Sequence, residues 1–136
     1  SKIFHRLVIE NILGEFEAEP LHIVNGIVHI TGGGIPGNIR RIFPEESIGA
    51  FFDNLHEPHE ALKTLKTLGK VDDEECYTTW HCGTALLIIA SPENVEDICS
   101  SINSSDKKVD AKIVGELTKT GEIEILSRFS NKKLVF

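Results

Sequence analysis

The sequence predicts an α+β fold in which a mixed, largely covered sheet packs against helices as a layered sandwich. Segments with apolar residues at helical spacing alternate along the chain with strand-like apolar runs. The chain has 136 residues, of which 40% are hydrophobic and 26% charged. These values are ordinary for a globular protein and allow a buried core, so we expect residues 1–136 to fold as a single domain.

The first predicted elements are a helix and a strand. Apolar residues recur near helical spacing across residues 4–13, and acidic turn residues interrupt this pattern at 14–20. The stretch 21–31 contains several β-branched residues and ends at three glycines, which is typical of a strand.

Alternation along the end of this strand separates two kinds of side chain. Val28 and Ile30 are predicted to face one side, and His29 and Thr31 the other. The following segment, 35–43, has apolar residues at positions i, i+4, i+7 and i+8. This spacing predicts a helix with one buried stripe.

The middle of the chain is predicted to contain a strand at 47–52, a helix that ends at Gly69, and a second strand at 84–90. The run 84–90 is almost uniformly apolar, which is typical of a central strand covered on both faces. The apolar face of the helix is expected to consist of Ala61, Leu62, Leu65 and Leu68.

The last third is predicted to hold one helix and two strands. Ser91 supplies a capping hydroxyl and Pro92 the first helical position. The inner face of that helix is expected to consist of Val95, Ile98, Cys99 and Ile102. Strands are predicted near 112–117 and 122–126, joined by a turn at 119–121.

A run of three glycines lies where the first strand meets the second helix. In His29-Ile30-Thr31-Gly32-Gly33-Gly34, the glycines leave backbone N–H groups uncovered, and the start of a helix adds its positive dipole end. This combination predicts a site for an anion, with phosphate as the expected ligand, and a plain flexible turn is the alternative. Asn38 and Arg41 are expected to lie beside Gly34, and Asn38 could instead cap or orient the loop.

Charge and composition exclude several other classes of function. The formal net charge is −7 and the pI about 5.3, which argues against sequence-independent binding of nucleic acid. No apolar run is long enough to span a membrane and no targeting segment opens the chain, so a cytoplasmic location is expected.

Cysteine and histidine spacing signals no metal site. The three cysteines form no C-x-x-C pair, so we expect them to be reduced and mostly buried. His56 and His59 are the densest histidine pair, but Pro58 between them disfavours a helical metal motif, and no metal ligand is assigned.

Two motif blocks carry a resemblance to a known family. The glycine run followed by Asn38-Ile39-Arg40-Arg41-Ile42-Phe43-Pro44 resembles the H-I-T-G-G-G … N-I-P-R-x-L-P signature of aminoimidazole ribonucleotide synthetase, or phosphoribosylformylglycinamidine cyclo-ligase. The run Glu75-Cys76-Tyr77-Thr78-Thr79-Trp80-His81-Cys82-Gly83-Thr84-Ala85 resembles the family's E-M-x-R-T-F-N-x-G-V-G block. Ile113-Val114-Gly115-Glu116 resembles a late strand of the same enzymes.

The resemblance implies that this chain is the C-terminal half of a two-domain enzyme, with a partly ferredoxin-like sandwich fold. The N-terminal ATP-binding domain, which in the family holds most of the ATP and Mg²⁺ contacts and the homodimer core, has no counterpart here. The fragment alone is therefore expected to bind no cofactor and to be inactive. Its expected partners are formylglycinamidine ribonucleotide and its own N-terminal domain.

The implied reaction is an ATP-dependent ring closure in purine biosynthesis. ATP phosphorylates the formyl amide oxygen of formylglycinamidine ribonucleotide, an internal nitrogen attacks the activated carbon, and phosphate leaves as the imidazole forms. The implied catalytic residue is His29, as a donor to a phosphoryl oxygen or a proton carrier, with a purely structural role as the alternative. The implied substrate-binding residues are Thr31, Gly32, Gly33, Gly34, Asn38, Arg41, His81 and Gly83. Arg41 could instead pair with Glu45 or Glu46.

Several residues depart from the family pattern and leave other functions open. They are Arg40, Cys76, Thr78, His81 and Ala85, where the family carries proline, methionine, arginine, asparagine and glycine. A related ATP-dependent enzyme, such as formylglycinamidine ribonucleotide amidotransferase, is one alternative. A non-catalytic module that binds a phosphorylated metabolite is another. Cys82 lies beside an apolar strand and is expected to be a core residue rather than a nucleophile.

Overall fold

The computed structural model describes residues 4–106 and 108–136 and confirms the α+β class. The chain forms two compact units. The first consists of residues up to Ile27 together with Ile88–Ile113, and the second of Val28–Leu87 and Val114–Phe136. Two of the three passages between the units lie within short strands, β1 (Gly26–His29) and β3 (Leu86–Ile89), which pair as a two-stranded sheet, and the third lies between Ile113 and Val114.

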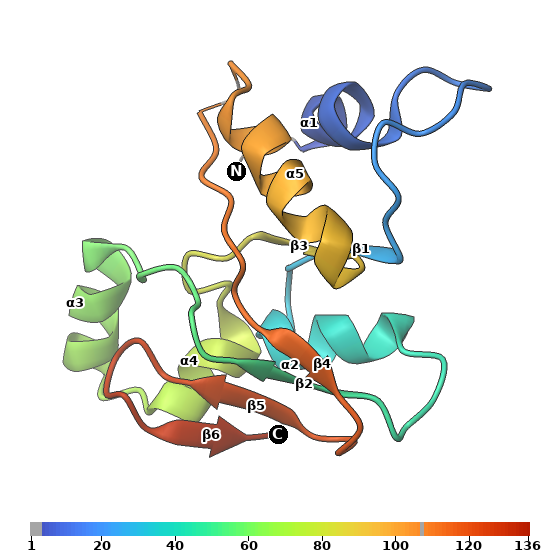
Figure 1. Ribbon diagram of the computed structural model, residues 1–136. Helices are drawn as coiled ribbons and strands as arrows, with labels where there is room; N and C mark the ends of the chain where they lie inside the picture. The colour runs from blue at the N-terminus through green and yellow to red at the C-terminus, as the bar shows by residue number, and fades with distance from the viewer. Residues whose placement is uncertain (1–3, 107) are drawn as a thin grey trace. The chain divides into compact units, whose positions relative to one another are not determined.

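The first unit is helical. It contains α1 (His5–Val8), a π-helical turn η1 (Ile9–Leu13) and α5 (Pro92–Asn103) (Figure 1). The predicted first helix is therefore present, with its second half widened to π geometry. The buried apolar side chains of this unit include Leu7, Ile12, Ile98 and Ile102.

The N-terminus of helix α5 agrees only in part with the prediction from the sequence. Pro92 occupies the first turn, as predicted. Among the described residues, however, the Ser91 side chain accepts no capping hydrogen bond, so the predicted capping role is wrong. Helix α5 contacts η1, where the Ser101 hydroxyl donates to the Asn11 carbonyl at 3.2 Å.

The second unit is built on a four-stranded mixed sheet. Its strand order is β4 (Glu116–Thr118), β2 (Gly49–Phe52), β5 (Ile123–Leu126) and β6 (Lys133–Val135) (Figure 1). Strand β2 runs antiparallel to β4 and parallel to β5, and β5 runs antiparallel to β6. The inner face buries Ala50, Phe52, Ile123, Ile125 and Leu134.

Three helices complete this unit: α2 (Gly34–Ile39), α3 (Glu60–Gly69) and α4 (Asp73–Thr79). A 3₁₀ turn, η2 (Arg40–Ile42), extends α2. Helices α2 and α4 pack against each other and lie on one side of the sheet (Figure 1). They contribute the buried residues Ile35, Ile39, Cys76 and Tyr77 to the core.

Two expectations about packing are wrong. The segment 84–90 is not a central strand: among the described residues β3 pairs with β1 alone, and only Leu87 of its four residues is buried. The two late strands are present but are not neighbours, since β2 lies between β4 and β5. Helix α3 ends at Gly69 as predicted, but Leu65 and Leu68 are 54% and 77% exposed.

Candidate functional site

The glycine run forms a tight corner between β1 and α2. Ile30 follows the strand, and its N–H donates to the Ala85 carbonyl at 2.9 Å, which holds the end of β1 beside the start of β3. The Gly34 N–H then donates to the Thr31 carbonyl at 3.1 Å and closes a turn. Gly33 has a φ of 98°, a conformation that glycine adopts without steric cost. The strand-to-helix corner is therefore located where the sequence predicts it.

Position 34 must be glycine because the backbone there lies against the backbone at Tyr77. Its φ is 60°, and a Cβ placed on it would lie 1.7 Å from the Tyr77 carbonyl oxygen. The first turn of α2 consequently rests on the last turns of α4. This contact joins the two motif blocks in space, although they are far apart in the sequence.

Asn38 is the residue that organises the corner. It is 4% exposed, and its side-chain amide donates to the carbonyl oxygens of Gly34 at 2.6 Å and of Thr31 and Gly32 at 3.3 Å. Its own Oδ1 accepts from the Thr31 hydroxyl at 3.3 Å. Because both polar atoms of Asn38 are used inside the loop, the geometry favours the loop-orienting alternative over direct substrate binding.

Two of the three glycine amides remain available to a ligand. The Gly34 amide is buried and closes the turn, whereas Gly32 and Gly33 are exposed. Within the described part of the chain, the amides of Gly32 and Gly33 donate to no backbone carbonyl. Successive backbone N–H groups in a turn are one of the arrangements with which proteins bind anions.

The remaining residues of the first block surround this corner. Val28 and Ile30 are buried while His29 and Thr31 are exposed, which confirms the predicted alternation. Arg41 is exposed on η2, and its Nη1 lies 3.4 Å from Asn38 Oδ1. The guanidinium is thereby tethered beside the loop and keeps most of its donors for another group.

The second block forms a turn at Cys82-Gly83. Both residues have positive φ, 47° and 93°, as the central residues of a type I′ turn do. The Thr84 N–H donates to the His81 carbonyl at 2.8 Å, and the Gly83 N–H donates to Nδ1 of the exposed His81 at 3.1 Å. A Cβ on Gly83 would lie 2.7 Å from the Glu57 carbonyl oxygen.

Cys82 is a core residue, as expected. It is fully buried, and its Sγ donates to the Cys76 carbonyl at 3.4 Å. Burial raises the pKa of the Cys82 thiol to about 12. A thiol that stays protonated is a poor nucleophile, so the structure assigns Cys82 to packing.

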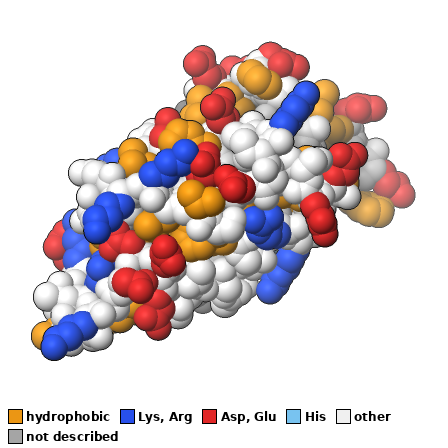
Figure 2. All heavy atoms as spheres, turned by 90° about the horizontal axis from the view of Figure 1, so that it is seen from below, with side chains coloured by type: hydrophobic (Ala, Val, Ile, Leu, Met, Phe, Trp, Pro, Cys, Tyr) orange, Lys and Arg blue, Asp and Glu red, His pale blue; other side chains and the backbone are white. Residues whose placement is uncertain are grey.

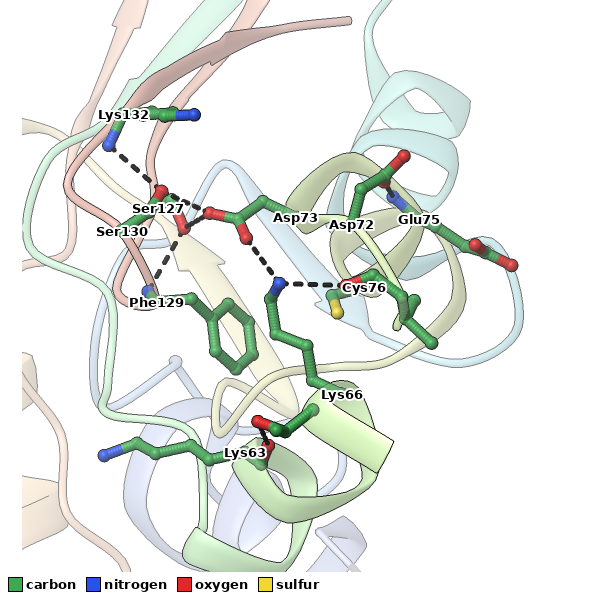
Figure 3. A network of polar contacts seen from close by, with 12 residues as sticks. Lys63, Lys66, Asp72, Asp73, Glu75, Cys76, Ser127, Phe129, Ser130 and Lys132 are labelled. Atoms are coloured by element: carbon green, nitrogen blue, oxygen red, sulfur yellow. Dashed lines mark hydrogen bonds and ion pairs between the residues drawn. The ribbon is translucent and has the colours of Figure 1, made fainter. Parts of the chain in front are cut away.

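A third polar cluster lies outside both sequence blocks (Figure 3). The Asp73 carboxylate accepts from the hydroxyls of Ser127 and Ser130, each at 2.5 Å, and from Nζ of Lys66 at 2.9 Å. Lys66 also donates to the Val71 carbonyl at 2.9 Å. The cluster therefore joins α3, the start of α4 and the β5–β6 loop.

Electrostatics within this cluster favour the charged forms. Burial acts to raise the pKa of Asp73, but the hydrogen bonds from Ser127 and Ser130 and the Lys66 ammonium outweigh it and lower that pKa. The hydrogen bond to Asp73 raises the pKa of Lys66 against the opposing effect of burial. No spacing in the sequence signals this cluster, because its members come from three separate segments.

Thr84 offers a test of the packing around the second block. It is 3% exposed, and its hydroxyl has no hydrogen-bond partner among the described residues. A buried, unpaired hydroxyl is destabilising, so Thr84→Val is expected to increase the free energy of unfolding by about 1 kcal/mol in urea denaturation. The control is Thr78→Val, which removes a hydrogen bond from an exposed hydroxyl to the Glu74 carbonyl. Equal effects of the two variants would contradict the assignment.

The surface carries charges of both signs. Figure 2 shows acidic, basic and apolar side chains interspersed over the displayed face rather than one extended basic field. No described helix is long and apolar enough to cross a membrane. Among the described residues, no group of three or more histidine, cysteine, aspartate or glutamate side chains is arranged to hold a metal ion.

Comparison with known proteins gives a family match across most of the chain. The family model described as AIR synthase related protein, C-terminal domain, matches residues 6–127. The phosphoribosylformylglycinamidine cyclo-ligase of Methanopyrus kandleri is 34% identical over 117 residues, which cover 86% of this chain and 30% of that protein. The enzyme of the same name from Methanococcus vannielii is 34% identical over 119 residues, covering 82% and 33%.

A bifunctional purine biosynthetic protein purD from Dictyostelium discoideum is also similar. It is 36% identical over 91 residues, which cover 63% of this chain and 11% of that protein. The chain thus spans about a third or less of the length of these curated relatives.

Proposed function

The chain belongs to the family of AIR synthase related proteins, as a C-terminal domain of that family, and on this premise we propose that it is the C-terminal part of an ATP-dependent cyclo-ligase. The proposed reaction converts formylglycinamidine ribonucleotide to aminoimidazole ribonucleotide. The names of the relatives and the two motif blocks support this substrate. In the proposal, ATP and Mg²⁺ are bound mainly by an N-terminal domain that is not among these 136 residues.

The observation that carries the proposal is the pair of outward amides at Gly32 and Gly33. They are exposed, they follow a strand end, and Asn38 holds the intervening carbonyls inward. Such an arrangement suits the 5′-phosphate of a ribotide. Arg41, tethered beside the loop, would add charge-assisted hydrogen bonds to the same phosphate.

The proposed role of this part of the protein is to position the substrate. Phosphoryl transfer and ring closure require aligned reactants and donors aimed at oxygen atoms, with little covalent chemistry from the protein. The exposed His29 at the end of β1 is proposed to donate to a phosphoryl oxygen or carry a proton. Thr31, His81 and Gly83 are proposed to line the same substrate region.

Gly32→Val tests the phosphate corner without disturbing the fold. A Cβ on Gly32 meets no atom within 4 Å, so the valine side chain would stand in open space beside the exposed amides. We expect the side chain to block the approach of phosphate to one of these amides. The affinity for ribose 5-phosphate, measured by calorimetric titration, should then fall by about tenfold, because one charge-assisted hydrogen bond is worth roughly 1.5 kcal/mol.

The control for this experiment is Gly37→Ala. Gly37 is exposed on α2, and a Cβ there also meets no atom within 4 Å. Its affinity for ribose 5-phosphate should match that of the unsubstituted chain. Unchanged affinity in Gly32→Val would rule out the phosphate role of the corner.

A non-catalytic module that binds a phosphorylated metabolite is the second candidate. The departures from the family pattern at Arg40 and Ala85 favour it. The length of the reading frame separates the two candidates. An upstream ATP-binding half in the gene supports the ligase, and ATP-dependent turnover by the protein of full length would establish it.

A further inference from the structure

We infer that His81 is a hydrogen-bond donor with a fixed tautomer, which presents its Nε2–H to an oxygen atom of the bound ribotide. The inference rests on the proposed function for the identity of the ligand. Its structural basis is the turn at Cys82-Gly83, where the Gly83 N–H donates to His81 Nδ1 at 3.1 Å.

The backbone bond determines where the imidazole proton lies. A neutral imidazole has one donor and one acceptor nitrogen. Because Nδ1 accepts the Gly83 N–H, it cannot carry the proton, and the proton is therefore on Nε2. His81 is exposed, and within the described residues its Nε2 has no hydrogen-bond partner in the protein. This ring edge is thus a donor available to a ligand.

The turn itself needs the Nδ1 acceptor. Cys82 is a fully buried, non-glycine residue with a φ of 47°, a conformation that costs about 1–3 kcal/mol unless neighbouring contacts hold it. The two hydrogen bonds to His81, through its carbonyl and its Nδ1, supply that restraint. Release of Nδ1 to act as a base would therefore weaken the turn.

Histidine reproduces both functions of an asparagine at this position. Asparagine Oδ1 and histidine Nδ1 are each attached to Cγ, so both can accept the N–H of the residue two positions ahead. The other polar atom, an amide N–H or Nε2–H, then points away as a donor. The asparagine in the family pattern and His81 in this chain are consequently equivalent in hydrogen bonding, despite their different shapes.

His59 shows the same backbone interaction in a structural setting. Its Nδ1 accepts the Ala61 N–H at 3.1 Å at the start of α3. Because His59 serves as a helix cap, it provides an internal control with the same expected tautomer and no proposed ligand.

The inference is tested by NMR and by two substitutions. A long-range proton–nitrogen spectrum of the chain at pH 8 should show His81 protonated at Nε2 and unprotonated at Nδ1. Addition of ribose 5-phosphate should shift the His81 Nε2 resonance and leave that of His59 unchanged. His81→Asn should keep the affinity within about twofold, whereas His81→Leu should lower it by about tenfold, the value of one lost hydrogen bond of roughly 1.4 kcal/mol.

The outcomes separate this inference from the proposed function. If ribose 5-phosphate leaves the amide resonances of Gly32 and Gly33 unmoved, the phosphate corner and this inference both fail. If those amides shift while His81 Nε2 does not, only the donor role of His81 fails. The opposite tautomer, or an equal loss of affinity in His81→Asn and His81→Leu, would also overturn it. Circular dichroism of each variant verifies that the fold is retained, and His81→Asn keeps the test valid where His81→Leu does not fold.

Discussion

Gly34→Ala is expected to destabilise the chain by about 3 kcal/mol or more, the combined cost of overpacking and of a strained backbone. The added Cβ would lie 1.7 Å from the Tyr77 carbonyl oxygen and 2.6 Å from the carbonyl carbon. Both atoms belong to the backbone of α4, so the overlap cannot be relieved by rotation of a side chain. Either α2 separates from α4 or the glycine corner rearranges.

Urea denaturation followed by circular dichroism measures this effect. The matched control is Gly37→Ala, three residues further along the same helix, where the new Cβ has open space. Replacement of an exposed helical glycine by alanine is expected to stabilise by about 0.5–1 kcal/mol. A Gly34→Ala variant as stable as the unsubstituted chain would show that the two backbones are not in contact.

Helix α2 could be predicted from the sequence because its signals are local. Glycines precede it, and apolar residues at helical spacing define its buried side. In the structure Ile35 and Ile39 are buried, as the spacing predicts. The final turn departs from the stripe, since Ile42 lies on η2 and is partly exposed. Local periodicity therefore predicts the type of element, but it does not predict which of the apolar residues at helical spacing are buried by the rest of the fold.

Strand partners could not be predicted, because they depend on distant segments. The apolar run 84–90 has the composition of a central strand, yet β3 has β1 as its partner in a separate two-stranded sheet. The turn at 119–121 suggests a hairpin between its flanking strands. Strand β2 pairs with both of them instead, so more than 60 residues of chain separate β2 from its partners.

In the candidate site, too, local features can be predicted from the sequence and hydrogen-bond partners cannot. Gly32, Gly33 and Gly34 mark a tight corner in the sequence because glycine adopts positive φ without steric cost. The sequence leaves two roles open for Asn38, ligand binding and loop orientation, and it does not show that the Gly34 amide closes a turn. These roles depend on carbonyl directions, which no residue pattern specifies.

Asp73→Asn is the second substitution with a large expected effect. Asp73 is the common acceptor for Ser127, Ser130 and Lys66 (Figure 3). The asparagine amide would place a donor against these donors and leave the Lys66 ammonium without a counter-charge. Hydrogen bonds to charged groups contribute about 1.5–3 kcal/mol each, so we expect a loss of about 2–4 kcal/mol in the free energy of unfolding.

The control is Glu60→Gln. Glu60 pairs with Lys63 at 2.9 Å, but its side chain is 83% exposed. Exposed pairs contribute about 0–1 kcal/mol, so this variant should unfold close to the unsubstituted chain. Similar stabilities for Asp73→Asn and Glu60→Gln would mean that the Asp73 cluster does not connect α3, α4 and the β5–β6 loop.

The loss of stability in Asp73→Asn should depend on pH, whereas a loss caused by overpacking or by a cavity should not. Because the folded-state pKa of Asp73 is lowered, its contribution to stability is fully present above the pKa of an unfolded aspartate, about 3.9. The contribution is lost as the pH falls through the folded-state pKa. The stability difference between the unsubstituted chain and Asp73→Asn should therefore be constant from pH 7 to pH 5 and shrink towards pH 2. A difference that persists undiminished at pH 2 would indicate that the asparagine disturbs packing, and that the carboxylate charge is not what holds the β5–β6 loop.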